Sequence, residues 1–237
     1  MHSFTHTHRE AGEGSAHERR GIVTISAWLY DLMVRWFVMH GREQEFRQMI
    51  ADLARLQSGE TVLDVGCGTG TLALVAKKRV GKTGRVCGID PSVPLLAGAR
   101  RKAARAGLPI DFQPGGIEQI PFSDQSFDVV LSTFMIHHLP DNLKRQGLSE
   151  IARVLKAGGC LLVVDFKRPE EYQSQPGQFG VGEMGLQDLP VLMKEAGFSQ
   201  TETGEIPFHM RSLAAGHQNY GFVLARKSQA AEERTTL

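Results

Sequence analysis

Four short apolar runs, separated by helical stretches, constrain the fold of this chain more than any other feature. The runs are rich in β-branched residues and each is bounded by Gly, Asp or Ser, as expected for strands buried on both faces of a parallel sheet. They lie at 61–65, 85–89, 127–132 and 160–166, with a weaker fifth run at 110–113. Helical periodicity fills the intervals at 71–79, 93–106 and 143–155, and we expect Gly158 and Gly159 to end the last helix.

This alternation predicts an α/β fold, namely a doubly wound, Rossmann-like sheet of seven mostly parallel strands with helices on both faces. A helix near 186–196 and strands near 201–206 and 220–225 complete the sheet. The length of 237 residues suits one such domain, which we expect to span 59–227. In this architecture a ligand binds beyond the carboxyl ends of the strands.

The segments outside the sheet divide into three parts. We expect a disordered polar arm at 1–20, two helices within 21–58 and a flexible tail at 228–237. The first helix, at 26–40, is rich in large apolar residues, and the second covers 44–56. The apolar helix is interpreted as a lid over the site or as an ordinary packing helix, and both readings can hold because a lid must bury one face.

Composition excludes several classes of partner. A net charge of +1 provides no field for a polyanion, so nucleic acid is not expected. Three cysteines without C-x-x-C spacing indicate neither a disulfide framework nor a zinc site. The histidines of the arm could bind a metal, but a solvated arm is the preferred interpretation, so no metal is expected; they are His2, His6, His8 and His17.

The chain shows no apolar signal core and no transmembrane run, which predicts a cytoplasmic protein. Transient contact with a membrane surface stays open, because apolar residues near the predicted site, Phe166, Tyr172 and Phe179, would suit either a docking surface or an apolar acceptor. No oligomeric state follows from the sequence.

The first strand runs into a glycine-rich loop, Asp64-Val65-Gly66-Cys67-Gly68-Thr69-Gly70. Glycines let the backbone turn sharply and approach a ligand closely, and the helix that follows offers free N–H groups. A dinucleotide fingerprint would be G-x-G-x-x-G, whereas the spacing here is G-x-G-x-G. The carboxylate of Asp64 suits a ligand with an ammonium group and would repel a pyrophosphate.

A second acid ends the next strand. Asp90 follows Gly70 by twenty residues and precedes Pro91 and Ser92. A carboxylate in this position can accept hydrogen bonds from both hydroxyls of a ribose. The loop and the acid together predict a nucleoside site.

Four segments extend this pattern: LDVGCGTG at 63–70, GIDPS at 88–92, IPFSDQSFDVV at 120–130 and HHLPD at 137–141. Through them the chain resembles the class I S-adenosylmethionine-dependent methyltransferases over about 45–167, within the group that includes the ubiquinone and menaquinone biosynthesis methyltransferases, the methyltransferase type 11-like proteins. The resemblance implies S-adenosyl-L-methionine as cofactor and a small-molecule acceptor. This acceptor could be apolar or aromatic, such as a quinone precursor, a lipid or a secondary metabolite.

The resemblance also implies the cofactor contacts. The glycine loop would lie against the methionine part and the ribose, Asp90 would bind the ribose hydroxyls, and Ser92 and Val93 would flank the adenine. Tyr30 would touch the pocket from the lid. Further contacts are expected from Cys67, Thr69, Pro91 and Ser132.

One position departs from the family. An acid that accepts from the adenine amino group commonly stands where this chain has Gly116. The backbone of Gly116 and Ile117, or the side chain of Glu118, could take over. Glu118 could equally be a solvated loop residue.

His137 is the candidate base, since a neutral imidazole can accept a proton near pH 7 and the segment resembles one in small-phenol O-methyltransferases. The alternative is that His137 and His138 only pack the loop. Methyl transfer itself is an in-line displacement that depends mainly on positioning. Two other functions stay open, a catalytically silent scaffold that binds the cofactor and a nicotinamide-dependent oxidoreductase, the second disfavoured by the loop spacing.

Overall fold

The computed structural model describes residues 41–168, 184–208 and 220–229. Several predictions fall outside these ranges: the polar arm with its four histidines, the apolar helix at 26–40 with Tyr30, and the segment that holds Tyr172 and Phe179. The predicted tail is described only at 228–229.

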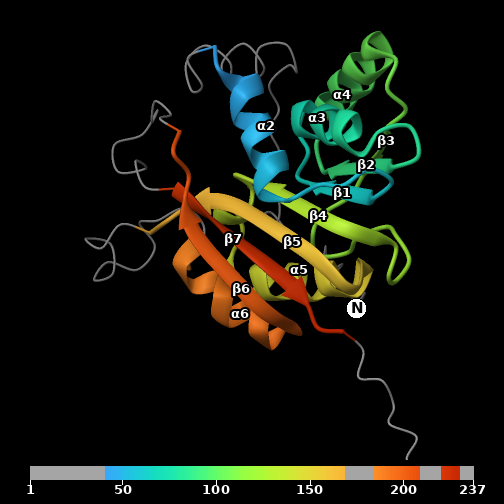
Figure 1. Ribbon diagram of the computed structural model, residues 1–237. Helices are drawn as coiled ribbons and strands as arrows, with labels where there is room; N and C mark the ends of the chain where they lie inside the picture. The colour runs from blue at the N-terminus through green and yellow to red at the C-terminus, as the bar shows by residue number, and fades with distance from the viewer. Residues whose placement is uncertain (1–40, 169–183, 209–219, 230–237) are drawn as a thin grey trace, which may run out of the picture.

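Seven strands form one sheet in the described part of the chain, in the order β3-β2-β1-β4-β5-β7-β6 (Figure 1). The pairs from β3 to β5 are parallel, and β7 runs antiparallel to both of its neighbours. This topology confirms the predicted fold class. The strands are β1 (Thr61–Val65), β2 (Arg85–Asp90), β3 (Asp111–Pro114), β4 (Phe127–Thr133), β5 (Leu155–Phe166), β6 (Phe198–Glu205) and β7 (Tyr220–Lys227).

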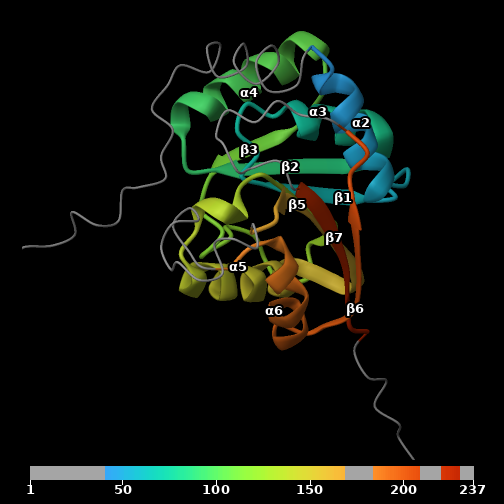
Figure 2. The same ribbon diagram turned by 90° about the vertical axis from the view of Figure 1, so that its left-hand side faces the viewer.

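Helices cover both faces of the sheet, as Figures 1 and 2 show. One face carries α2 (Glu43–Leu53), α3 (Thr71–Val80) and α4 (Val93–Ala106), and the other carries α5 (Asp141–Val154) and α6 (Leu189–Glu195). Two 3₁₀ turns, η2 (Ile136–His138) and η4 (Leu186–Asp188), precede α5 and α6. The predicted helix at 186–196 therefore begins as a 3₁₀ turn and continues as α6.

The strands are buried on both sides, which explains their nearly continuous apolar runs. Val62 and Leu131 belong to the core beneath α2 and α3, whereas their neighbours Leu63 and Val130 belong to the core beneath α5 and α6. Alternate residues of one strand thus serve opposite layers. The same alternation decides on which face each polar residue at a strand end lies.

The end of α5 differs from the prediction, because the helix stops at Val154 and β5 begins at once. Gly158 and Gly159 lie inside β5, where the register with β4 shifts between Phe127 and Val129. Gly158 has φ +73°, and a Cβ on Gly159 would lie 2.9 Å from the Asp128 carbonyl oxygen. These glycines permit an irregularity in the strand and a close backbone approach, so they were misread as a helix stop.

The strand order reverses between β1 and β4, since the chain moves outward from β1 to β3 and then returns to the other side of β1. A doubly wound sheet opens a crevice for ligands at this point, beyond the carboxyl ends of the strands. Among the described helices, none combines the length and the apolar character that crossing a membrane requires.

Candidate active site

The glycine loop after β1 is shaped by three residues in the left-handed region, Gly66, Gly68 and Gly70, with φ of +72°, +53° and +75°. Glycine is required at Gly66 and Gly70 because a side chain would have no room there, as well as because of the backbone conformation. A Cβ on Gly66 would lie 2.6 Å from Cγ of Met135, and one on Gly70 would lie 2.7 Å from Cζ of Phe112. The loop therefore has one compact shape, packed between β3 and the segment after β4.

Asp90, the last residue of β2, is held by the same loop. Its Oδ2 accepts the N–H of Gly68 at 2.9 Å, and its Oδ1 accepts the N–H of Ser92 at 2.8 Å. Burial raises the pKa of Asp90, while these two hydrogen bonds oppose the rise. Each oxygen keeps acceptor capacity, so the fixed carboxylate can receive two neighbouring hydroxyls.

Three buried side-chain atoms at the ends of β1 and β4, or on the helix above them, have no hydrogen-bond partner within the described residues. They are Oδ2 of Asp64, Oγ of Ser132 and Nε of Arg47. A buried polar atom without a partner is rare and destabilising unless a ligand or water supplies one. Asp64 and Arg47 lie on the α2 side of the sheet and Ser132 lies on the α5 side, so unpartnered polar atoms occur on both faces near the carboxyl ends of β1 and β4.

Asp64 is 1% exposed and carries the most perturbed carboxyl group of the site. Burial raises the pKa of Asp64 to about 7, the positive charge of Arg47 opposes the rise, and the negative charge of Asp90 adds to it. A ligand ammonium at the free oxygen would favour the ionised carboxylate.

His137, the candidate base, is oriented by a carboxylate. Its Nδ1 lies 2.7 Å from Oδ1 of Asp165, and its backbone N–H donates to Oδ2 of the same residue at 3.2 Å. Asp165 is 2% exposed and also accepts the N–H of Phe166. Because the carboxylate accepts from Nδ1–H, the lone pair of the neutral ring is on Nε2.

Asp165 was not predicted from the sequence. A signal existed, since Asp165 lies near the carboxyl end of β5 in the same manner as Asp64 on β1 and Asp90 on β2. Acids in this position recur at one edge of the sheet. Arg47 was missed as well, because a cation on an amphipathic helix usually faces solvent.

A chain of aromatic rings extends from His137 through Phe166. Phe134 lies 5.1 Å from Phe166 and 5.8 Å from Phe46, and Phe166 lies 5.0 Å from the His137 ring. Phe134 has φ +54°, a strained conformation for a bulky residue. Strain of this kind is often found at functional sites. Together these rings, with Phe208 and Tyr220, form the aromatic cluster.

Glu118 lies close to the position of the missing acid. A Cβ on Gly116 would lie 2.5 Å from Cδ of Glu118 and still nearer to its two oxygens. The Glu118 side chain is exposed, and its carboxylate has no hydrogen bond or ion pair in the described part of the chain. It is anchored through its backbone, because Gln146 donates to its carbonyl oxygen at 2.9 Å.

The remaining predicted residues lie at the same edge. Cys67, Thr69 and Ser92 are buried, and Ile117 packs on α5, where a Cβ on Gly147 would lie 2.6 Å from its Cδ1. Pro91 is exposed beside Asp90. The structure therefore brings every predicted site residue that it describes to the carboxyl edge of β1, β2, β3 and β4.

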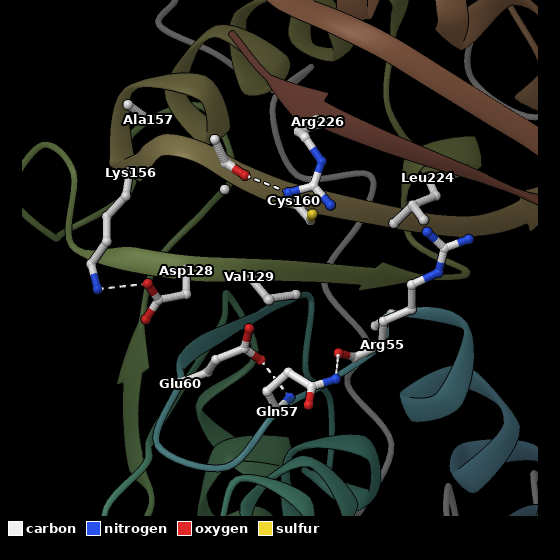
Figure 3. Close-up of a pocket in the computed structure, with 13 residues that line it drawn as sticks. Arg55, Gln57, Glu60, Asp128, Val129, Lys156, Ala157, Cys160, Leu224 and Arg226 are labelled. Carbon is white, nitrogen blue, oxygen red and sulfur yellow. Dashed lines mark hydrogen bonds and ion pairs between the residues drawn. The ribbon is translucent and has the colours of Figure 1, made fainter. Parts of the chain in front are cut away.

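A separate cavity of about 370 Å³ opens at the opposite edge of the sheet, near the start of β4 and β5 (Figure 3). Three of its charged groups are paired: Lys156 with Asp128, Arg226 with the Gly158 carbonyl oxygen, and Arg55 with Glu202 outside the lining. The cavity shares none of the candidate site residues.

Comparison with known proteins places this geometry in context. A family model described as a methyltransferase domain matches residues 62–159. Demethylmenaquinone methyltransferase of Thermus thermophilus is 37% identical over 152 residues, which is 64% of this chain and 65% of the relative, just under two thirds of its length. Demethylmenaquinone methyltransferase of Listeria welshimeri is 34% identical over 191 residues, 77% of this chain and 78% of the relative.

Among solved structures, a methyltransferase from Aquifex aeolicus described as SAM dependent superposes with a TM-score of 0.61 at 24% identity, covering 76% of this chain and 88% of that one. The fold and the glycine loop thus define a class I methyltransferase. The chain belongs to the S-adenosylmethionine-dependent methyltransferases and is similar within them to the ubiquinone and menaquinone biosynthesis group. Membership in this family replaces the nicotinamide-dependent alternative.

Proposed function

We propose that this enzyme methylates a planar, hydroxylated aromatic ring of the quinol type, with S-adenosylmethionine as donor. The observation that carries the proposal is the pair of His137 and Asp165 beside the aromatic cluster. Such a site offers a proton acceptor and flat apolar walls together. The names of the relatives, which refer to demethylmenaquinone, support the same class of acceptor.

The donor is proposed to lie along the crevice. Asp90 accepts the ribose hydroxyls, Asp64 accepts the ammonium group, and the glycine loop leaves room for the backbone to approach the thioether region. Ser132 offers a hydroxyl at the end of β4. When bound, the donor supplies an electrophilic methyl group, and the protein accelerates transfer mainly by positioning, an effect of roughly 7 to 11 kcal/mol in favourable cases.

His137 is proposed to act on the acceptor. Its Nε2 accepts the proton of a ring hydroxyl, which raises the electron density of the ring. A ring carbon would then bond to the methyl group as the methyl–sulfur bond breaks, and the proton on that carbon would be lost to solvent as the ring regains aromaticity. Asp165 keeps Nδ1 protonated and stabilises the imidazolium that results. His138, whose ring lies 3.8 Å from that of His137, is assigned to packing of the same turn.

Glu118 is proposed to replace the acid absent at Gly116. The adenine is attached to the ribose that Asp90 binds, and β3 with its following loop is the next element outward in the sheet. The amino group of the adenine needs a hydrogen-bond acceptor near the loop after β3. The free Glu118 carboxylate, which covers the Cα of Gly116, supplies one.

The test combines binding and turnover. Calorimetry with S-adenosylhomocysteine is expected to show one site per chain, and incubation with S-adenosylmethionine and a chemically reduced 2-demethylnaphthoquinone should yield the ring-methylated product by mass spectrometry. If the protein bound S-adenosylhomocysteine but did not methylate this quinol, the proposed acceptor class would be rejected. The catalytically silent scaffold that binds the cofactor would then be the remaining alternative. Absence of binding would reject the cofactor assignment.

A further inference from the structure

Lys144 carries a buried charge that the proposed chemistry does not use. Its side chain is 1% exposed, and α5, on which it lies, begins four residues after His137. We propose that Lys144 is a positioning residue for the proposed base. Together with Asp141 it fastens residues 184–188 against the end of β5. This segment keeps Asp165 buried, and Asp165 orients His137. The inference rests on the proposed function, because it takes His137 as the base.

Three polar groups close a cycle between α5 and the segment 184–188. Nζ of Lys144 donates to Oδ1 of Asp141 at 2.9 Å and to the carbonyl oxygen of Met184 at 2.7 Å. The backbone N–H of Met184 donates to the same Asp141 oxygen at 3.2 Å. A buried ammonium group is stable only where a carboxylate and other acceptors replace water, so the cycle holds Met184 at the start of α5.

The same segment is anchored a second time, just beyond the end of β5. The side-chain amide of Gln187 accepts the backbone N–H of Arg168 at 3.0 Å and donates to the Arg168 carbonyl oxygen at 3.1 Å. Asp188 accepts the backbone N–H of Gly185 at 2.9 Å and pairs with Arg168 at 3.5 Å. Residues 184–188 therefore bridge the start of α5 and the chain that leaves β5.

This bridge lies beside the carboxylate that orients the proposed base. In the β5–β7 register Asp165 lies opposite Gly221, and a Cβ on Gly221 would lie 3.4 Å from Cδ2 of Leu186. Asp165 follows Val163 by two residues and shares its face of the sheet, and Val163 and Leu186 belong to the same core beneath α5 and α6. Leu186 is 4% exposed and Asp165 is 2% exposed. The apolar side chain of Leu186 thus helps to shield the carboxylate from water.

The shielding of Asp165 matters because its two oxygens hold both the ring and the backbone of His137. Hydrogen bonds of a carboxylate are stronger and better fixed where water does not compete for its oxygens. If the segment 184–188 moved away, water would reach Asp165 and the imidazole would lose its fixed orientation. Small displacements of a reacting group can remove a large part of a rate. Lys144 therefore acts on the reaction through Asp165.

The test compares Lys144→Met with a matched control, Lys77→Met, which removes another buried lysine. Lys77 is 6% exposed and lies on α3, which covers the opposite face of the sheet (Figure 1). It donates to the carbonyl oxygens of Gly81 at 3.0 Å and Gly84 at 2.6 Å. Backbone amide hydrogen exchange by NMR, turnover, and calorimetry with S-adenosylhomocysteine are measured for each variant.

Lys144→Met is expected to speed amide exchange about tenfold or more at 184–188 and at His137, whose N–H donates to Asp165. Turnover at saturating substrates should fall about ten- to a hundredfold, with unchanged affinity for S-adenosylhomocysteine. Lys77→Met should leave turnover and the exchange at these residues unchanged. Lys144→Arg, which keeps the charge, should show a smaller loss in both, and it provides the measurement if Lys144→Met fails to fold.

Faster exchange at 184–188 with unchanged exchange at His137 and unchanged turnover would overturn the inference and show that Lys144 serves stability alone. Equal loss of turnover in Lys144→Met and Lys77→Met would also overturn it. The exchange measurement needs no acceptor. If the wild-type protein methylated no quinol while Lys144→Met still sped the exchange at His137, the proposed function would fall and the link from Lys144 to Asp165 would stand.

Discussion

Nδ1 of His137 lies 2.7 Å from Oδ1 of Asp165, although 28 residues separate them in the chain. The contact joins the turn after β4 to the end of β5, its parallel neighbour in the sheet. The same carboxylate also accepts the backbone N–H of His137, so ring and backbone are fixed together. Orientation of this kind distinguishes a base from a histidine that only fills space.

Removal of the proposed base should slow turnover without weakening the binding of S-adenosylhomocysteine. His137→Ala is expected to lower turnover about a hundredfold or more, since the proposed proton acceptor is lost. Asp165→Asn should lower turnover at least about tenfold with unchanged binding of S-adenosylhomocysteine. His138→Ala serves as the control for loss of a neighbouring ring. Unchanged turnover in folded His137→Ala would leave only the packing role.

Substitution of Asp90 should weaken donor binding. Asp90→Ala is expected to cost about 1.5 to 3 kcal/mol in the binding of S-adenosylhomocysteine, the scale for hydrogen bonds to a charged group. Asp111→Ala, at the start of β3 on the opposite edge, is the matched acid-to-alanine control. An unchanged affinity in folded Asp90→Ala would reject the ribose placement.

Donor binding should release a proton at mildly acidic pH. The pKa of Asp64 is raised to about 7 without ligand, and an ammonium group favours the ionised form. Affinity should therefore rise with pH up to about 7 and then level off. Calorimetry in two buffers with different ionisation enthalpies measures the proton released, and Asp64→Asn should abolish it. Equal heats in both buffers near pH 6 would contradict this assignment.

The same shift affects folding with a defined sign. The folded-state pKa of Asp64 lies above the unfolded value of 3.8, so its stabilising contribution is complete below that value and is lost as pH rises through about 7. The ligand-free protein should therefore gain stability from Asp64→Asn at pH 8.

The glycine loop should tolerate no side chain at Gly70. Gly70→Ala combines a left-handed φ with a Cβ only 2.7 Å from Phe112 and 2.9 Å from Cβ of Ala99, so a loss of about 2 to 4 kcal/mol in unfolding free energy is expected. Gly107→Ala isolates the conformational cost, because Gly107 has φ +64° and open space around it, and it should lose about 1 to 2 kcal/mol. If urea denaturation showed the same loss of unfolding free energy for Gly70→Ala and Gly107→Ala, the steric clash with Phe112 and Ala99 would not explain the effect at Gly70.

Glu118 should set the preference for adenine. The wild-type protein is expected to bind S-adenosylhomocysteine about threefold to tenfold more tightly than S-inosylhomocysteine, which carries an oxygen in place of the amine. Glu118→Ala should remove this preference. Gly116→Asp combined with Glu118→Ala should restore it, since Glu118 supplies the atoms that would obstruct a Cβ at position 116. If Glu118→Ala still preferred S-adenosylhomocysteine to S-inosylhomocysteine, Glu118 would be a solvated residue with no role in adenine binding.

The fold was predictable because strands buried on both faces leave a plain apolar signal, and α4 begins and ends as expected at Val93 and Ala106. Gly158 and Gly159 were wrongly predicted to end a helix, because a glycine permits a strand irregularity as readily as a helix end. Asp64 and Asp90 were predictable since each lies near the carboxyl end of an apolar strand in the sequence. Arg47 and Asp165 were not, because their roles depend on contacts with Thr133 and His137, 86 and 28 residues away.

The close approach of Met135 to Gly66 links the proposed donor site to the turn that carries the proposed base. The methionine side chain occupies the space that any side chain at Gly66 would need, and Met135 immediately precedes the turn that carries His137. The glycine loop and the turn that carries the proposed base are thus one packed unit, so a larger side chain on one side requires a smaller one on the other. Substitution of Met135 should therefore disturb the proposed donor site together with the proposed base.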